Sequence, residues 1–402
     1  MYRTRSRIWG ALLTLMIAIS CSAPSEDGRT VNDIAILNAD APLRVDFNEL
    51  VDSVSYIALD TRQCLVGDID IVKRDGDMLF VKDNKGLYAF NSSGMFVSKI
   101  GTKGNGAHEY MYIQAFYLDK KSKHVCIVSH PDNKLLEYSY SGKFISVASL
   151  SENTLCMDNI ICRTSDSLVV YNALSNDVKE RPAEYTLLTN ASGQWQEEPL
   201  LGGIRFKSQN VRYPFLYNSM TLLHGNVYAV SGLSDIVYKH SGKGMLPAFR
   251  VSLPKLCPPG SVLQEYEDMD FFSLRDALCE KGYGLGLAAI TSIGNDLVLS
   301  LPEFKAVVTD GCEGIVIDSK VYNKDTDIHS LSFFTSGISE DNLGYIEASS
   351  LLKKREHIMQ GDNRQLKTLL ETLSTDDNPI VYQYHFKKGL METLKYKLAQ
   401  QT

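Results

Sequence analysis

Short polar turns that lead at once into short apolar strands recur along the chain. In the first of them, the charged turn 74–77 precedes the apolar run 78–81. There are six such pairs, whose strands lie at steps of 46, 43, 59, 70 and 46 residues and contain Leu79, Val125, Leu168, Val227, Leu297 and Leu343. A strand unit recurring about every 40–50 residues is typical of a β-propeller, in which each blade is one four-stranded sheet. The pattern therefore predicts an all-β, six-bladed β-propeller.

A second pattern, of Ser-Gly pairs, has nearly the same period. The pairs lie at 93–94, 141–142, 192–193 and 241–242, at steps of 48, 51 and 49 residues, and each follows a strand-like run. Glycine tolerates the positive φ of a hairpin turn, and serine bonds back to the local backbone. We therefore expect each pair to join the third strand of a blade to its fourth.

The two ends of the chain contain the pieces needed to close a ring. The run 380–386 has the character of a strand and would be the third strand of the sixth blade, while 54–59, from the other end, would supply the fourth. A closed ring leaves no open sheet edge to pair wrongly. We therefore predict a clasp between the N- and C-terminal strands, with both ends needed for stability.

Two longer segments interrupt the strand pattern and predict helical insertions in the fifth and sixth repeats. Within 351–373, four leucines follow helical spacing: Leu366, Leu369, Leu370 and Leu373. Between the fourth and fifth repeats, 261–264 resembles a capping box at the start of a helix, and Gly282 is a suitable stop.

The N-terminus has the features of an export signal. Residues 1–20 combine three arginines with a 13-residue, mostly apolar stretch, which fits a signal peptide but is too short to span a bilayer. The stretch leads into Cys21, as at a bacterial lipoprotein processing site, where the cysteine becomes acylated; an ordinary secretory signal is the alternative. We predict a signal peptide over 1–20, a lipidated tether over 21–42, the propeller over 43–388 and a C-terminal tail over 389–402.

Charge and cysteine content narrow the range of partners. The net charge of −7 becomes −10 once the three arginines of the signal are removed, and the one basic cluster is 353–355, so we expect no nucleic-acid binding. Seven cysteines besides Cys21 leave at least one unpaired. Cys257 and Cys279 flank one insertion, and either a disulfide between them or two free thiols is compatible with the sequence.

Two clusters of residues are candidates for binding. His108, Glu109 and Tyr110 follow the first repeat, and a histidine beside a carboxylate can transfer protons or bind a cation; the alternative is a structural loop. Arg212 and Tyr213 lie in the aromatic-rich stretch 209–217, which suits a protein or sugar surface, or else packing between blades. The glycines of 101–106 precede a strand rather than a helix, which argues against a nucleotide-binding loop.

The order of elements resembles the six-bladed β-propeller lipoproteins of Bacteroidetes, relatives of NHL-repeat propellers. The resemblance is carried by 51–61, by 235–238, by the strand after Asn378-Pro379 and by the loop 104–110. That loop has the form Gly-x-Gly-Pro-Gly-Glu-Tyr in the family, and Ala107 and His108 replace its proline and the glycine that follows it here. The resemblance implies the propeller fold and a lipid anchor.

We therefore predict a non-catalytic, monomeric lipoprotein of the outer membrane, periplasmic or at the cell surface, that binds a protein or glycan partner without a cofactor or metal. The sequence contains neither a His-Glu-x-x-His nor a Gly-x-Ser-x-Gly motif. The alternative is an extracytoplasmic hydrolase or lyase with a cation in the propeller channel. It requires at least three carboxylates or amides from different blades to converge on the axis.

Overall fold

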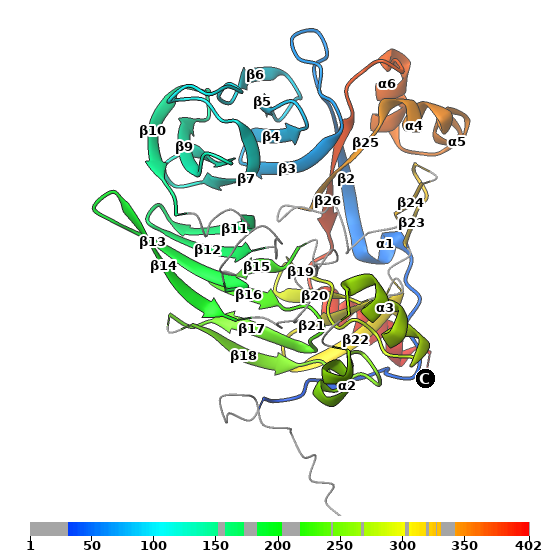
Figure 1. The fold of residues 1–402 in the computed structure, drawn as a ribbon. Helices are drawn as coiled ribbons and strands as arrows, with labels where there is room; N and C mark the ends of the chain where they lie inside the picture. Colours follow the sequence, from blue (N-terminus) through cyan, green and yellow to red (C-terminus); the bar gives the residue numbers. More distant parts are fainter. Residues whose placement is uncertain are drawn as a thin grey trace, which may run out of the picture.

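The structure is a computed structural model that describes residues 31–151, 157–172, 183–202, 218–242, 244–266, 269–301, 305–318, 321–326, 328–330 and 342–401. Six of its sheets are the blades of a β-propeller, arranged around a common axis (Figure 1), which confirms the predicted fold. Blades one to four each consist of four antiparallel strands in sequence order.

The strands of the first two blades are β3 (Ile69–Asp75), β4 (Met78–Asp83), β5 (Leu87–Asn91) and β6 (Phe96–Lys99), then β7 (Tyr112–Asp119), β8 (His124–His130), β9 (Lys134–Ser139) and β10 (Phe144–Ser149). Those of the next two are β11 (Met157–Thr164), β12 (Ser167–Asn172), β13 (Tyr185–Ala191) and β14 (Gln194–Leu201), then β15 (Met220–Leu223), β16 (Asn226–Val230), β17 (Ile236–His240) and β18 (Met245–Arg250). Blade five contains β19 (Ala289–Ile293), β20 (Asp296–Leu301), β21 (Lys305–Thr309) and β22 (Glu313–Asp318), with β1 (Ala35–Ile36) added beside β22. A short hairpin of β23 (Val321–Asn323) and β24 (Ile328–Ser330) follows it.

The apolar strands that define the sequence repeat are the second strands of the blades. In blade five every residue of β20 is buried, and in blade one all of β4 but its first residue is buried. A strand between two neighbouring blades is covered on both faces, so it has no polar side. The fourth strands are outermost and mostly exposed, as in β10 and β14. This difference explains why the second strands gave the clearest signal.

The Ser-Gly pairs lie between third and fourth strands, as predicted. Gly94, Gly142, Gly193 and Gly242 have φ angles of 82, 80, 86 and 80°. At Gly94 a Cβ would lie 1.9 Å from the carbonyl oxygen of Ala58, so this turn can pack on the end of the preceding blade only as glycine.

The predicted clasp between the two ends of the chain is confirmed. Blade six contains β25 (Leu343–Ile346), β26 (Ile380–Phe386) and, from the N-terminal end, β2 (Val51–Ala58). In the antiparallel pairing of β2 with β26, Tyr56 lies opposite Tyr382. The first strand expected for this blade would precede Leu343, in residues 331–341, which lie outside the described part of the chain.

A second contact between the ends covers blade five. There β1 pairs in parallel with β22, and Leu43 forms a bridge with Ile317, so part of the segment expected as a tether lies against the ring. Helix α1 (Phe47–Leu50) and helix α7 (Leu390–Ala399) share one apolar cluster with this blade. Residues 389–402, expected as a tail, thus include a helix whose Leu390, Met391 and Leu394 are buried.

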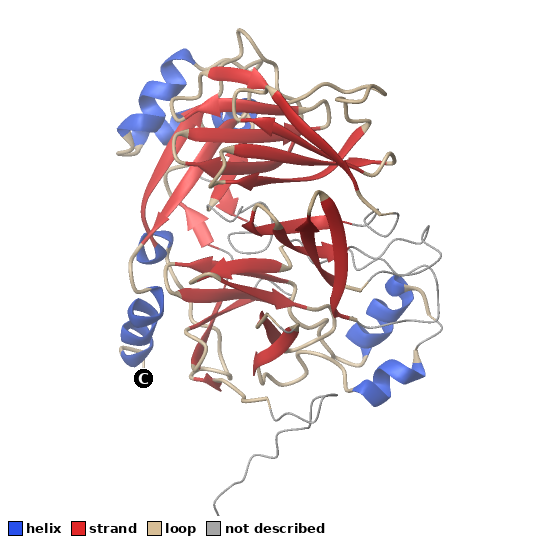
Figure 2. Ribbon diagram, turned by 90° about the vertical axis from the view of Figure 1, so that its left-hand side faces the viewer, coloured by secondary structure: helices blue, strands red, loops and turns tan. Residues whose placement is uncertain are grey.

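The helical insertions exist, but their boundaries differ from the predicted ones. Residues 351–373 do not form one helix: α4 (Ala348–Lys353), α5 (Arg355–Gln360) and α6 (Arg364–Thr372) are separated by Lys354 and by Gly361, whose backbone is extended. The predicted apolar face is present, since Leu366 and Leu370 are fully buried. Figure 2 shows the helices at the periphery of the stacked sheets.

The capping box predicted at Ser261 is wrong. Helix α2 (Gly260–Glu265) begins after Pro259 without a side-chain cap. The cap belongs instead to α3 (Phe271–Glu280), where the Asp270 carboxylate accepts from the backbone N–H groups of Phe272 and Ser273. Gly282, with φ +74°, lies just after α3 and ends it as predicted.

Candidate functional site

A groove of about 980 Å³ follows the seam between blade six and blade one. Helix α6 forms one wall, and the chain after β2 together with the β5–β6 turn forms the other. In Figure 1 these elements lie together at the edge of the ring, where β2 leads towards β3. The groove therefore contains residues from both ends of the chain.

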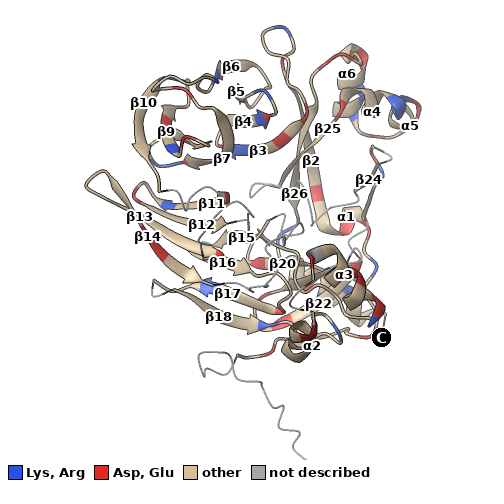
Figure 3. Cartoon of the chain, viewed as in Figure 1, with Lys and Arg blue, Asp and Glu red and all other residues tan. Residues whose placement is uncertain are grey.

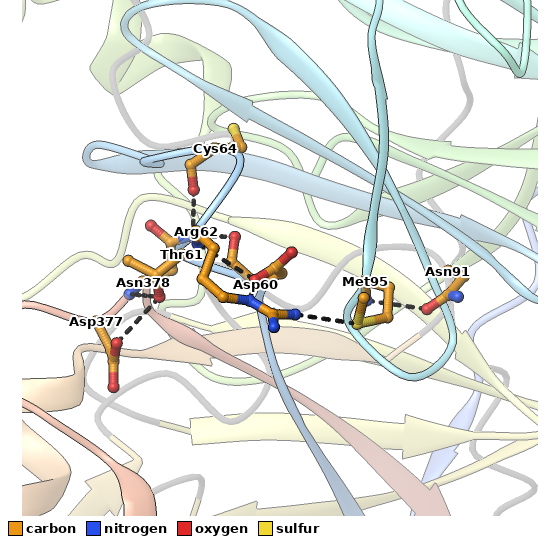
Figure 4. A network of polar contacts seen from close by, with 8 residues as sticks. All are labelled: Asp60, Thr61, Arg62, Cys64, Asn91, Met95, Asp377 and Asn378. Atoms are coloured by element: carbon orange, nitrogen blue, oxygen red, sulfur yellow. Dashed lines mark hydrogen bonds and ion pairs between the residues drawn. The ribbon is translucent and has the colours of Figure 1, made fainter.

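One buried amide holds this seam together (Figure 4). Asn378, which is 3% exposed, donates from Nδ2 to the carbonyl oxygens of Cys64 (2.7 Å) and Asp60 (3.1 Å). Its Oδ1 accepts from the backbone N–H of Val66 at 2.8 Å. Next to it, the hydroxyl of Thr61 donates to a carboxylate oxygen of Asp377 at 3.0 Å. The connection between β2 and β3 is thereby fixed to the strand that closes the ring.

A carboxylate and a guanidinium lie along the wall of the groove. Asp60 Oδ1 accepts from the Arg62 side chain (Nε, 2.9 Å), and Arg62 Nη2 donates to the sulfur of Met95 at 3.9 Å (Figure 4). The side chain of Asp60 is 5% exposed and that of Arg62 is 76% exposed. The hydrogen bond from Arg62 lowers the pKa of Asp60. Asp60 Oδ2 is buried, and no hydrogen-bond partner for it lies within the described residues.

Helix α6 covers the open edge of β2 and presents a polar stripe to the groove. The amide of Gln365 pairs with the backbone of Tyr56, donating from Nε2 to its oxygen at 2.9 Å and accepting from its nitrogen at 3.4 Å. Arg364, Thr368 and Thr372 are exposed and follow one another at i, i+4 and i+8, so they lie on one face, along the groove.

The candidate residues His108, Glu109 and Tyr110 lie between β6 and β7, and their contacts are mainly structural. Glu109 accepts from the backbone N–H of Gly106 at 2.8 Å, and Tyr110 is 1% exposed in the core between blades one and two. Burial raises the pKa of Tyr110 to about 12. The exposed ring of His108 stacks on Phe144, with centroids 3.8 Å apart. These contacts are those expected of a structural loop, which was the alternative to a binding site. A binding role for the three residues stays a prediction.

The other candidate residues lie outside the described part of the chain: Cys21, Arg212 and Tyr213. Both Cys257 and Cys279 are free thiols, so the disulfide considered between them is not formed here. None of the helices in the described ranges is both long and apolar enough to cross a membrane.

A smaller hollow of about 380 Å³ lies at the end of the ring where first and second strands are joined. It is lined by charged side chains from blades one, two and three: Lys73, Lys120, Lys121, Arg163, Asp119 and Asp166. Figure 3 shows both basic and acidic residues scattered over the sheets, loops and helices. Among the described residues, no group of three or more His, Cys, Asp or Glu side chains is placed to hold a metal ion. The alternative enzymatic interpretation stays untested.

Sequence reasoning did not select the residues of the groove. Two of the segments that carried the family resemblance, 51–61 and the strand after Asn378-Pro379, are nevertheless the ones that meet here. In the sequence these two segments indicated the fold alone. Their contact in the structure is what indicates a site. Arg62 and Arg364 had no signal of their own.

Comparisons with known proteins are consistent with this architecture. A crystal structure of a putative exported protein from Bacteroides fragilis NCTC 9343 is 19% identical, with a TM-score of 0.65, over 88% of this chain and 100% of that one. A member of the DUF4221 family from Bacteroides vulgatus is 10% identical, with a TM-score of 0.48, over 84% and 97%. The first likeness shows the fold. A search of curated proteins found no match.

The family assignment comes from the sequence of nearly the whole ring. Residues 31–385 match a family described as a domain of unknown function, DUF4934. This range runs from the first described residue, past β1 and the six blades, to the penultimate residue of β26. Since the match covers well over half of the chain, the protein belongs to the DUF4934 family.

Proposed function

We propose that the protein is a non-catalytic lipoprotein, anchored through Cys21, whose propeller binds a partner protein outside the cytoplasm in the groove between blades six and one. The single observation that carries the proposal is the groove itself, which is large, open and lined by a fixed polar network. Ligand sites in proteins are typically concave and largely preformed, with a few well-placed polar groups. The export of the similar Bacteroides fragilis protein, as its name has it, supports the location.

A protein partner fits the lining better than a neutral glycan does. Among the described residues that line the groove, Tyr56 is the one aromatic side chain, and at 4% exposed it offers no flat ring on which a sugar can stack. Exposed groups include Arg62, Thr368 and Met95, which suit the mixed polar and apolar surface of a polypeptide. Glycan binding is the competing outcome of the test below.

Anchoring through Cys21 is expected to depend on its thiol. Cys21→Ser removes the atom that carries the lipid, so the protein should move from the membrane fraction to the soluble fraction and lose label from radioactive palmitate. A matched control is Cys312→Ser, at an exposed free cysteine of the ring, which should change neither. Retention of label by Cys21→Ser would contradict lipidation at this position.

The binding proposal is tested by site-specific photocrosslinking in cells that make the protein. A photoreactive residue at Thr368, in the groove, should give a discrete protein adduct. The same residue at Tyr396, which is 70% exposed on α7, is the control. An adduct with Tyr396 but none with Thr368 places the partner elsewhere. A carbohydrate adduct, or none at either position, contradicts the proposal.

A further inference from the structure

We infer that the groove takes a peptide segment with an acidic and an aliphatic side chain, in which the acidic group meets Arg364 and a backbone N–H meets Asp60. This inference rests on the proposed function and names the chemistry of the partner. Its basis is the distribution of unsatisfied polar atoms, free charge and apolar surface along the groove.

The groove contains a carboxylate oxygen that accepts no hydrogen bond from the described residues. Of the two carboxylates in the lining, Asp377 is satisfied at both oxygens, by the Thr61 hydroxyl and by the backbone N–H of Ser374 (2.7 Å). Asp60 is satisfied at Oδ1 alone, although its side chain is 5% exposed. A buried carboxylate oxygen without a partner is costly, and a donor supplied by a ligand removes that cost. A peptide N–H is such a donor.

Two guanidinium groups line the groove. Arg62 is held in place by Asp60 and Met95 and still exposes most of its side chain. Arg364, at the first turn of α6, is exposed and has no ion pair or hydrogen-bond partner of its side chain within the described ranges. Guanidinium groups bind carboxylates in two-pronged, charge-assisted contacts. An acidic side chain of the partner therefore complements this part of the groove.

The lining of the groove also contains apolar surface. Leu369 and Leu373 are half-buried in the lining, and Met95 is 42% exposed beside Arg62. An aliphatic side chain gains from covering such a surface, whereas a sugar ring is better served by an aromatic face. A polypeptide combines the three groups that the groove requires of a ligand: a backbone N–H donor, an acidic side chain and an aliphatic side chain.

The test selects ligands from a phage library of random heptapeptides on the immobilised protein lacking residues 1–21. We expect enriched sequences to contain Asp or Glu beside Leu, Ile or Val. Arg364→Ala should weaken the binding of a synthetic enriched peptide at least tenfold, the loss typical of a charge-assisted hydrogen bond, and added salt should weaken it too. Thr368→Trp, which fills the groove, should abolish it. Arg44→Ala removes an exposed arginine elsewhere and should have no effect.

Enriched peptides without acidic residues, or binding unchanged in both Arg364→Ala and Thr368→Trp, would overturn the inference. A labelled oligogalacturonide that binds while no peptide is enriched would point to an acidic glycan. If the Thr368 photocrosslink gives a protein adduct that Arg364→Ala leaves intact, the proposed function stands and the acidic peptide does not. If neither experiment gives a ligand, both fail.

Discussion

Asn378→Asp is expected to destabilise the folded protein by about 3–5 kcal/mol, because it reverses the polarity of the group that closes the seam. The amide donates to two carbonyl oxygens, of Cys64 and Asp60. A carboxylate of the same shape has no hydrogen to donate and places a buried charge against both oxygens. A loss of this size is a large part of the stability of a typical domain.

The measurement is denaturant unfolding followed by the fluorescence of Trp195, the one tryptophan outside residues 1–20. Trp195 lies on β14 in blade three, away from the seam. A lower denaturant midpoint of the Trp195 signal means that the stability of the whole ring depends on the seam held by Asn378. Asn105→Asp, at an exposed loop position, is the control and should leave the midpoint unchanged. Because the introduced carboxyl is neutral in acid, the loss should shrink at low pH; a loss independent of pH, or a midpoint unchanged at Trp195, would contradict this account.

The fold was predictable from the sequence where burial and turn geometry are local. Strands such as β20 are covered on both faces, so after Asp296 this strand contains only apolar residues and one serine, and the Ser-Gly turns require a positive φ that glycine provides. The helix boundaries were less predictable. Most residues of 348–372 are good helix formers, and the break between α5 and α6 lies at Gly361 and at the N-cap Asn363, whose side chain accepts from the backbone N–H of Leu366. The break at Lys354 has no such signal in the sequence.

The groove was not predictable, because the hydrogen bonds that cross its seam join residues more than 300 positions apart. Asn378 contacts backbone atoms of residues 60, 64 and 66, and a side chain bonded to distant backbone leaves no pattern in either segment. The loop at 108–110 attracted attention because its histidine and glutamate are adjacent in sequence. In the structure the Glu109 carboxylate accepts a hydrogen bond from the backbone of its own loop, so its position beside His108 in the sequence reflects the local fold of that loop.

Stability is expected to fall by about 3 kcal/mol between pH 4.5 and pH 8 because of one buried carboxyl, Glu184. It lies between blades three and four, 5% exposed, where the hydroxyl of Ser231 donates to Oε2 at 2.7 Å. Burial raises its pKa from the ordinary 4.5 to about 7. The folded protein therefore keeps a proton that the unfolded chain releases. This contribution is complete below pH 4.5 and is lost as the pH rises through 7.

Glu184→Gln should remove most of this slope, because glutamine has the same size and does not titrate. Urea unfolding at pH 5, 6, 7 and 8 measures it, with Glu280→Gln at an exposed position as the control. Burial also raises the pKa of Asp235 and Asp296, which contributes a slope of the same sign, and lowers the pKa of His240, which contributes a slope of the opposite sign. Carboxyls with a lowered pKa, such as Asp75, lose their contribution in more acidic solution, below this window. Wild-type stability that rises from pH 5 to 8, or equal slopes in the wild type and Glu184→Gln, would show that Glu184 is charged in the folded ring.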